Sequence, residues 1–131
     1  MLRSRTLQTS IACPPQQVYD YVFNPAHLPQ WAPGLCLFIR PDGDHWLLTT
    51  PQGELTFRFT PTNALGVLDH FVGTPAGEIH VPMRVIANGA GSELLLTLFQ
   101  QPSMSDTDFA TDAALVEQDL ARLKALLESA R

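Results

Sequence analysis

The stretch Glu54-Leu55-Thr56-Phe57-Arg58-Phe59-Thr60 alternates strictly between polar and apolar residues. Successive side chains of a β-strand point to opposite faces of a sheet, so Leu55, Phe57 and Phe59 would share one face. The polar members would share the other face, as in an antiparallel sheet that has one face on a core and one in water. The stretch therefore predicts a half-buried strand of an antiparallel sheet.

Segments with a similar strand-like character lie on both sides of this one, separated by turn sequences such as Pro41-Asp42-Gly43-Asp44 and Asn88-Gly89-Ala90-Gly91. Pro82 interrupts one of them, and because proline has no backbone N–H we expect an edge position or a bulge there. We expect the other strands at residues 6–12, 35–40, 45–50, 66–72, 78–88 and 92–100.

Helical spacing appears at the two ends of this run of strands. After the first strand, Pro14-Pro15 and then Asn24-Pro25 delimit one short helix, and a second follows over residues 26–31. The chain ends in a helix of about 25 residues, which Ser105 and Asp108 would begin as a capping box. Apolar residues at spacings of three and four form one stripe along this last helix: Phe109, Ala113, Val116, Leu120, Leu123 and Leu127.

These elements predict a single α+β domain over residues 1–131. A curved antiparallel sheet of six to seven strands, wrapped around the long C-terminal helix, would bury every apolar face just described. The two short helices after the first strand would close one end. At 131 residues the chain has the usual size of one domain, and its apolar share of 45% is ordinary for a globular protein.

Composition excludes several classes of partner. The formal net charge is -5 and the eight Lys and Arg residues are scattered, so neither nucleic acid nor an anionic membrane surface is expected. The sequence contains no apolar run of the ~20 residues that a membrane span needs, and no apolar segment of a signal peptide follows the start. We therefore expect a cytoplasmic protein without membrane insertion.

The opening of the chain resembles that of START-like proteins, the SRPBCC superfamily, which includes polyketide cyclase/dehydrase-like and lipid-transfer proteins. The resemblance lies in residues 11–22, Ile-Ala-Cys-Pro-Pro-Gln-Gln-Val-Tyr-Asp-Tyr-Val, and 24–31, Asn-Pro-Ala-His-Leu-Pro-Gln-Trp. The order of the expected elements also fits these proteins, so the resemblance covers nearly the whole chain. It implies a helix-grip fold with a cavity for apolar molecules, and it leaves open whether the chain is an enzyme, because this fold carries many functions.

Asp69 and His70 are the candidate catalytic residues. Neighbours on a strand point to opposite faces, so only one of the two side chains can enter a cavity, and the sequence leaves open which. Either group, once removed from water, could act as a general base. The alternative is a polar side chain that faces solvent or bonds a neighbouring strand. Arg58, Arg84 and His80 alternate onto the polar face, where we expect contact with water.

Aromatic and thioether side chains suit a flat apolar ligand, and five such residues are the candidate lining of the cavity. A packed core without a cavity would produce the same pattern. The five residues are Trp31, Trp46, Phe57, Phe59 and Met83.

No cofactor and no metal are expected. The four His and two Cys residues lack the spacing of a zinc site, and the sequence holds no phosphate-binding glycine loop. Cys13 and Cys36 are expected to be free, buried thiols.

The strand over Leu94–Phe99 is apolar on both faces, which suggests that a second copy of the chain covers its outer face in a homodimer. The sequence thus favours a protein that binds a small apolar ligand, lipid-like, aromatic or polyketide-like, with cyclase or dehydratase-type activity left open. The rival is a non-catalytic interaction module or dimeric structural protein with a filled cavity.

Overall fold

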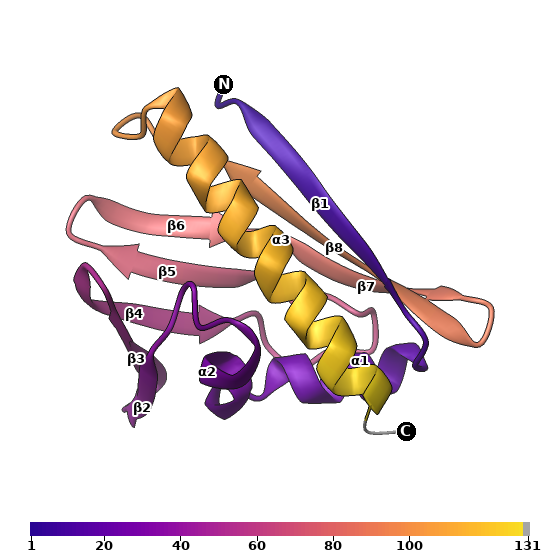
Figure 1. Cartoon of the computed structure of the whole chain (residues 1–131). Coiled ribbons are helices and arrows are strands. Elements are labelled where there is room, and N and C mark those ends of the chain that lie inside the picture. The colour runs from indigo at the N-terminus through magenta and orange to yellow at the C-terminus, as the bar shows by residue number, and fades with distance from the viewer. Residues whose placement is uncertain (130–131) are drawn as a thin grey trace.

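The computed structural model describes residues 1–129 as an α+β fold in which one long helix crosses strongly bent antiparallel sheets (Figure 1). Two short helices lie together at one end, close to the C-terminal end of the long helix. The elements in chain order are β1 (Ser4–Ile11), α1 (Pro15–Phe23), the 3-10 turn η1 (Pro25–His27), α2 (Leu28–Trp31), β2 (Phe38–Asp42), β3 (His45–Thr50), β4 (Gly53–Phe59), β5 (His70–Thr74), β6 (Gly77–Val81), β7 (Met83–Asn88), β8 (Gly91–Phe99) and α3 (Asp106–Ser129).

The strands within residues 1–129 number eight and form two sheets, which corrects the expectation of one sheet with six to seven strands. Their orders are β1-β8-β7 and β2-β3-β4-β5-β6, and the pairings are antiparallel. The eighth strand arises at Pro82, which divides the expected strand 78–88 into β6 and β7. Pro82 cannot donate to a ladder, but its carbonyl accepts a hydrogen bond from the N–H of Thr97 at 2.9 Å. The chain therefore passes from one sheet to the other at this residue.

The strand expected at 66–72 begins only at His70. The preceding segment is a loop held by Asn63, whose side-chain oxygen accepts hydrogen bonds from the N–H groups of Leu65 and Val67. Gly66 has φ +71°, and a Cβ there would collide with the carbonyl of Val85, so glycine is required for both reasons. A local side-chain network replaces the strand at this point.

The strand expected at 35–40 is also displaced, because β2 begins at Phe38. The N–H groups of Leu35 and Cys36 both bond the carbonyl of Ala32, at 3.0 and 2.9 Å, and continue the turn that ends α2. Cys36 and Cys13 are free and buried, as predicted.

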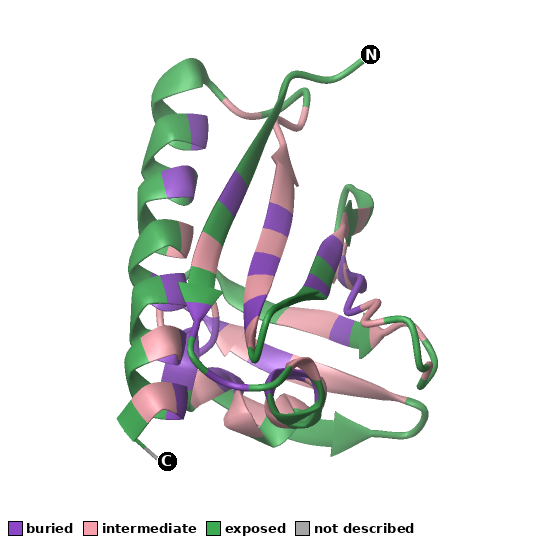
Figure 2. Ribbon diagram, turned by 90° about the vertical axis from the view of Figure 1, so that its right-hand side faces the viewer, coloured by how far each residue is buried: buried purple, intermediate pink, exposed green. Residues whose placement is uncertain are grey.

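The long helix α3 agrees closely with its prediction. The side chain of Ser105 accepts a hydrogen bond from the N–H of Asp108 at 3.0 Å, and Asp108 accepts one from the N–H of Ser105 at 3.3 Å, so the capping box is present. Of the predicted stripe, Val116 is half-buried and the other five residues are buried. Figure 2 shows these buried positions along the side of α3 that faces the strands.

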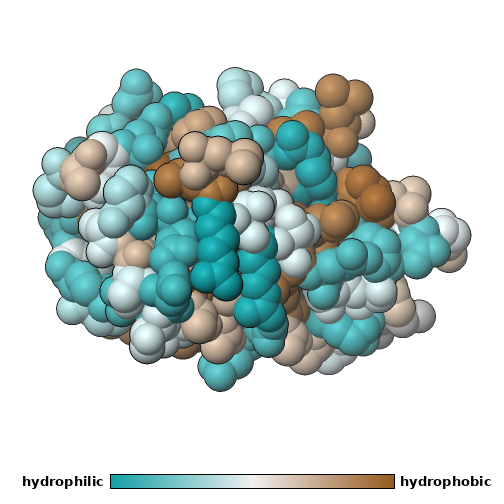
Figure 3. Space-filling view, turned by 90° about the horizontal axis from the view of Figure 1, so that it is seen from above, coloured by the Kyte–Doolittle hydropathy of each residue, from teal (hydrophilic) through white to brown (hydrophobic). Residues whose placement is uncertain are grey.

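The outer face of β8 is less apolar than its sequence indicates. Leu94 and Leu96 are buried toward the core, whereas Leu95 is half-buried between its cross-strand neighbours Gln8 and Arg84. Seen from above in Figure 3, hydrophilic side chains cover much of the surface and hydrophobic ones occupy separate areas among them. The homodimer therefore stays a prediction, and few apolar side chains on the outer face of β8 support it.

Candidate ligand cavity

A cavity of about 230 Å³ lies between α3 and the inner face of the strands. The long helix supplies one wall, β4, β5, β6 and β8 supply the opposite walls, and α2 with the turn after it closes one end. The apolar part of the lining consists of Leu28, Trp31, Ala32, Leu35, Leu55, Val72, Ile79, Val81, Leu96, Leu98, Phe99, Met104, Leu115 and Val116.

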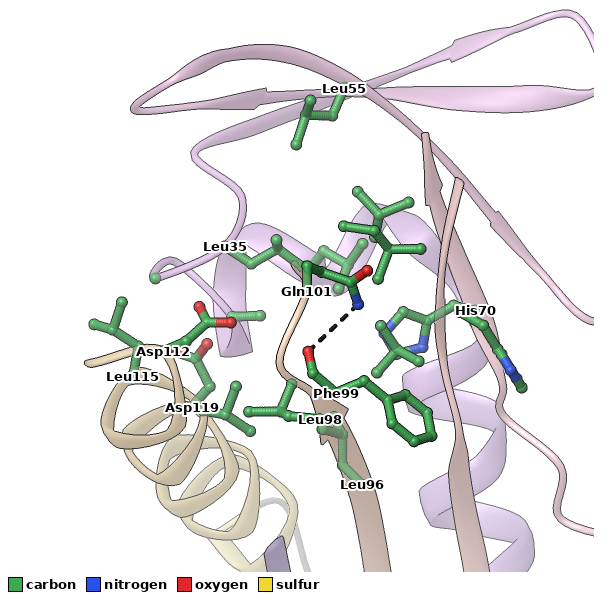
Figure 4. A pocket seen from close by; sticks show the side chains of 18 of the residues that line it. Leu35, Leu55, His70, Leu96, Leu98, Phe99, Gln101, Asp112, Leu115 and Asp119 are labelled. Carbon is green, nitrogen blue, oxygen red and sulfur yellow. Dashed lines mark hydrogen bonds between the residues drawn. The ribbon is translucent and has the colours of Figure 1, made fainter. Parts of the chain in front are cut away.

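His70 is the buried imidazole of this cavity. It begins β5, is 6% exposed, and its ring points toward the cavity from the strand side (Figure 4). Phe57 stacks on the ring at 5.2 Å and Phe59 meets it edge-on at 5.7 Å, so the orientation of the imidazole is fixed by packing. Burial lowers the pKa of His70 to about 4, which makes the ring neutral at neutral pH.

Two carboxylates lie on the wall opposite His70. Asp119 is buried, donors from the backbone of Gly34 and from Nη1 of Arg122 hold it, and the Arg122 contact is 3.1 Å long. Asp112 lies about two helical turns closer to the start of α3, at the rim of the cavity (Figure 4). Burial raises the pKa of both carboxyl groups, and for Asp119 the Gly34 and Arg122 contacts oppose that shift.

Trp31 lines the cavity from α2 and leaves a polar atom unpaired. The residue is 4% exposed, and Nε1 is buried without a hydrogen-bond partner among the described residues. Native interiors pair nearly all buried donors, so this atom is an exception within residues 1–129.

Solved structures of similar shape are numerous. XoxI from Bacillus cereus matches over 96% of both chains with a TM-score of 0.77 and 16% identity. The solution structure of the Aha1 dimer from Colwellia psychrerythraea matches over 97% of both chains with a TM-score of 0.78 and 14% identity. The crystal structure of Ara h 8.0201 covers 98% of this chain and 99% of its own, with a TM-score of 0.71 and 9% identity.

The chain has the helix-grip fold. The resemblance in the opening residues is thus confirmed at the level of the fold. No family model and no curated protein sequence matches the chain.

Within this helix-grip fold, the structure decides which face of the 67–72 segment turns inward. Leu68, His70 and Val72 are buried toward the core, so the imidazole enters the cavity. The carboxylate of Asp69 does not line it. That carboxylate accepts hydrogen bonds from the N–H of Met83 and from His80 at 2.9 Å each, and it forms an ion pair with Arg84.

The donors around Asp69 hold the pKa of its carboxyl below the usual value, although burial opposes them. Arg58 likewise lies outside the cavity, where it pairs with Glu78 at 3.0 Å and covers the ring of Phe71 at 4.1 Å. The polar face of the helix-grip sheet is therefore tied together by ion pairs.

Of the five aromatic and thioether residues proposed as lining, Trp31 alone is among the described residues that line the cavity. Phe57 and Met83 are each 1% exposed and belong to the core, with Trp46 and Phe59 packed against it. Four of the five therefore occupy the packed core, the alternative that the sequence left open. Phe57 and Phe59 reach the site only indirectly, by positioning His70.

Asp112 and Asp119 were missed by the sequence analysis, although a signal for them exists. Asp112 lies three residues after Phe109 and four before Val116, and Asp119 lies three after Val116 and four before Leu123. These spacings put two acids within the apolar stripe of the helix, where charged side chains are rare unless paired.

Residues 1–129 contain neither a cluster of metal-binding side chains nor a membrane-spanning helix. Within them, His, Cys, Asp and Glu side chains do not gather in groups of three or more that could hold a metal ion. None of the helices described there is both long and apolar enough to cross a membrane.

Proposed function

We propose that this chain binds a small, largely apolar molecule in the cavity between α3 and the strands. The observation that carries the proposal is the cavity itself, about 230 Å³ of space lined mainly by aliphatic and aromatic side chains. Concave apolar sites with a few fixed polar groups are the usual form of small-molecule sites. A filled core at this place would have favoured the interaction-module alternative instead.

The polar groups favour binding over acid–base catalysis. A general base works best when its pKa lies near the operating pH, whereas His70 has a pKa of about 4. Asp69, the other candidate base, does not line the cavity, and its carboxylate is engaged by three donors. We therefore favour a protein that carries or senses its ligand over one with cyclase or dehydratase-type activity.

Titration with the neutral fluorescent probe N-phenyl-1-naphthylamine tests the proposal. We expect saturable binding and quenching of tryptophan fluorescence, because Trp31 lines the cavity. Val116→Phe adds a ring on the helix wall of the cavity and should weaken binding by about tenfold or more, since the added volume competes with the probe. Ile79→Phe, which fills the cavity from β6, should act in the same direction.

Leu126→Phe is the matched control, because Leu126 is exposed on the same helix and outside the described lining. It should leave the affinity for the probe unchanged. Thermal unfolding of each variant separates a filled cavity from a folding defect. If Val116→Phe and Ile79→Phe both bind the probe with unchanged affinity, the probe binds outside the cavity and the proposal is contradicted.

A further inference from the structure

His70 presents an unused hydrogen-bond acceptor to the cavity. Its Nδ1 lies 3.1 Å from the carbonyl oxygen of Leu68, which can only accept, so Nδ1 carries the hydrogen. In the neutral ring the lone pair is then on Nε2, and within residues 1–129 no donor bonds that atom. The ring points into the cavity (Figure 4), so a donor that occupies the cavity can reach it.

The surroundings of Nε2 favour a donor that carries no negative charge. Asp112 and Asp119 face the same space, while Lys and Arg are absent from the described lining. Arg122 bonds Asp119 at 3.1 Å but does not itself line the cavity. The imidazole of His80 also lines the cavity, but its Nε2 bonds Asp69. An anionic ligand would thus meet two acidic side chains and no Lys or Arg, and like charges repel.

A ligand that covers Nε2 without offering a donor would leave this acceptor buried and unpaired, which is costly, so a ligand that supplies a donor gains affinity over one that does not. The imidazole is also held rigidly, between Phe57 and Phe59 and by the Leu68 carbonyl, so little ordering is needed on binding. The site is therefore prepared for one directed hydrogen bond inside an apolar space.

We propose that the ligand is an uncharged molecule with an apolar ring or chain and one hydroxyl group, and that this hydroxyl donates its hydrogen to Nε2 of His70. The inference rests on the proposed function, because it names the ligand class of the same cavity. It excludes free fatty acids and other carboxylates as preferred ligands.

Three small probes of similar size separate the possibilities by isothermal titration calorimetry at pH 7. 2-Naphthol can donate a hydrogen bond, 2-methoxynaphthalene has nearly the same shape but cannot, and 2-naphthoate is an anion. We expect 2-naphthol to bind about fivefold to tenfold more tightly than 2-methoxynaphthalene, the effect of one neutral hydrogen bond, and 2-naphthoate to bind most weakly.

Two substitutions assign that preference to His70. In His70→Asn the amide N–H can still serve the Leu68 carbonyl, but the side chain is too short to place an acceptor at the position of Nε2. The preference for 2-naphthol should then fall below about twofold. His70→Gln, whose amide oxygen reaches that position, should restore part of it.

Equal binding of 2-naphthol and 2-methoxynaphthalene by the natural chain would overturn the inference and leave the proposed function intact. A preference that persists in His70→Asn, or tightest binding of 2-naphthoate, would also overturn it. If none of the three probes binds, the proposed function itself fails. The comparison within the natural chain decides the question even where a variant does not fold.

Discussion

His70 couples the stability of the protein to pH. Its pKa is about 4 in the folded chain against an ordinary value of 6.5, because burial disfavours the charged ring. The unfolded chain therefore binds a proton below pH 6.5 that the folded chain does not bind until about pH 4. The contribution of His70 to the free energy of unfolding is fully present above pH 6.5 and is lost as the pH falls through this window, by about 3 kcal/mol in total.

Chemical denaturation at several pH values measures this loss. Asp112 and Asp119 have raised pKa values, so their contribution has the opposite sign and declines as the pH rises. The difference between the natural chain and His70→Asn isolates the histidine. The variant should be flatter between pH 6.5 and 4, and identical slopes would show that His70 is not buried in solution.

Asp69 offers a second test among single residues, because its role is structural. Its carboxylate bonds the N–H of Met83 and two side chains, and it joins the loop before β5 to β7. Asp69→Asn should lower the free energy of unfolding by about 1–3 kcal/mol, since charge-assisted bonds are replaced by weaker ones. Affinity for 2-naphthol should remain within about twofold of the natural chain. A selective loss of binding at full stability would mean that Asp69 acts at the cavity.

At the scale of elements, α3 is held by one apolar face. Leu120 is 3% exposed on that face, whereas Leu126 is 36% exposed on the same helix. Leu120→Ala should lower the free energy of unfolding by about 2–5 kcal/mol, because it leaves a cavity beneath the helix. Leu126→Ala should cost less than about 1 kcal/mol. Equal effects in urea denaturation would contradict the orientation of α3.

At the scale of the whole molecule, the predicted homodimer depends on the outer face of β8. Leu95 is the central apolar side chain there, half-buried between Gln8 and Arg84. If the dimer forms through this face, Leu95→Glu should convert it to a monomer in sedimentation velocity at micromolar concentration, because it introduces an unpaired charge at the interface. Leu126→Glu, on α3, should leave the dimer intact. A natural chain that sediments as a monomer would remove the hypothesis.

Local patterns in the sequence predicted most of the elements of this protein and its fold class. The alternation at 54–60 predicted β4, the spacing of Phe109 to Leu127 predicted the buried face of α3, and Ser105 with Asp108 predicted its capping box. These features depend on residues a few positions apart, and the side-chain periods of 2 and 3.6 express such neighbours directly. The resemblance of residues 11–31 to START-like proteins further predicted that the sheet wraps around the long helix in a helix-grip fold.

Contacts between distant residues decided the rest. The side chain of His70 points inward because it packs against Phe57 and Phe59 of another strand. The alternation in the sequence does not decide which face of β5 points inward. The lining likewise depends on how far α3 stands from each strand: Phe57 is covered by its neighbours, whereas Leu98 and Val116 border open space. Hydrophobic burial is non-directional, so a sequence that specifies apolar residues does not specify which of them are left beside a cavity.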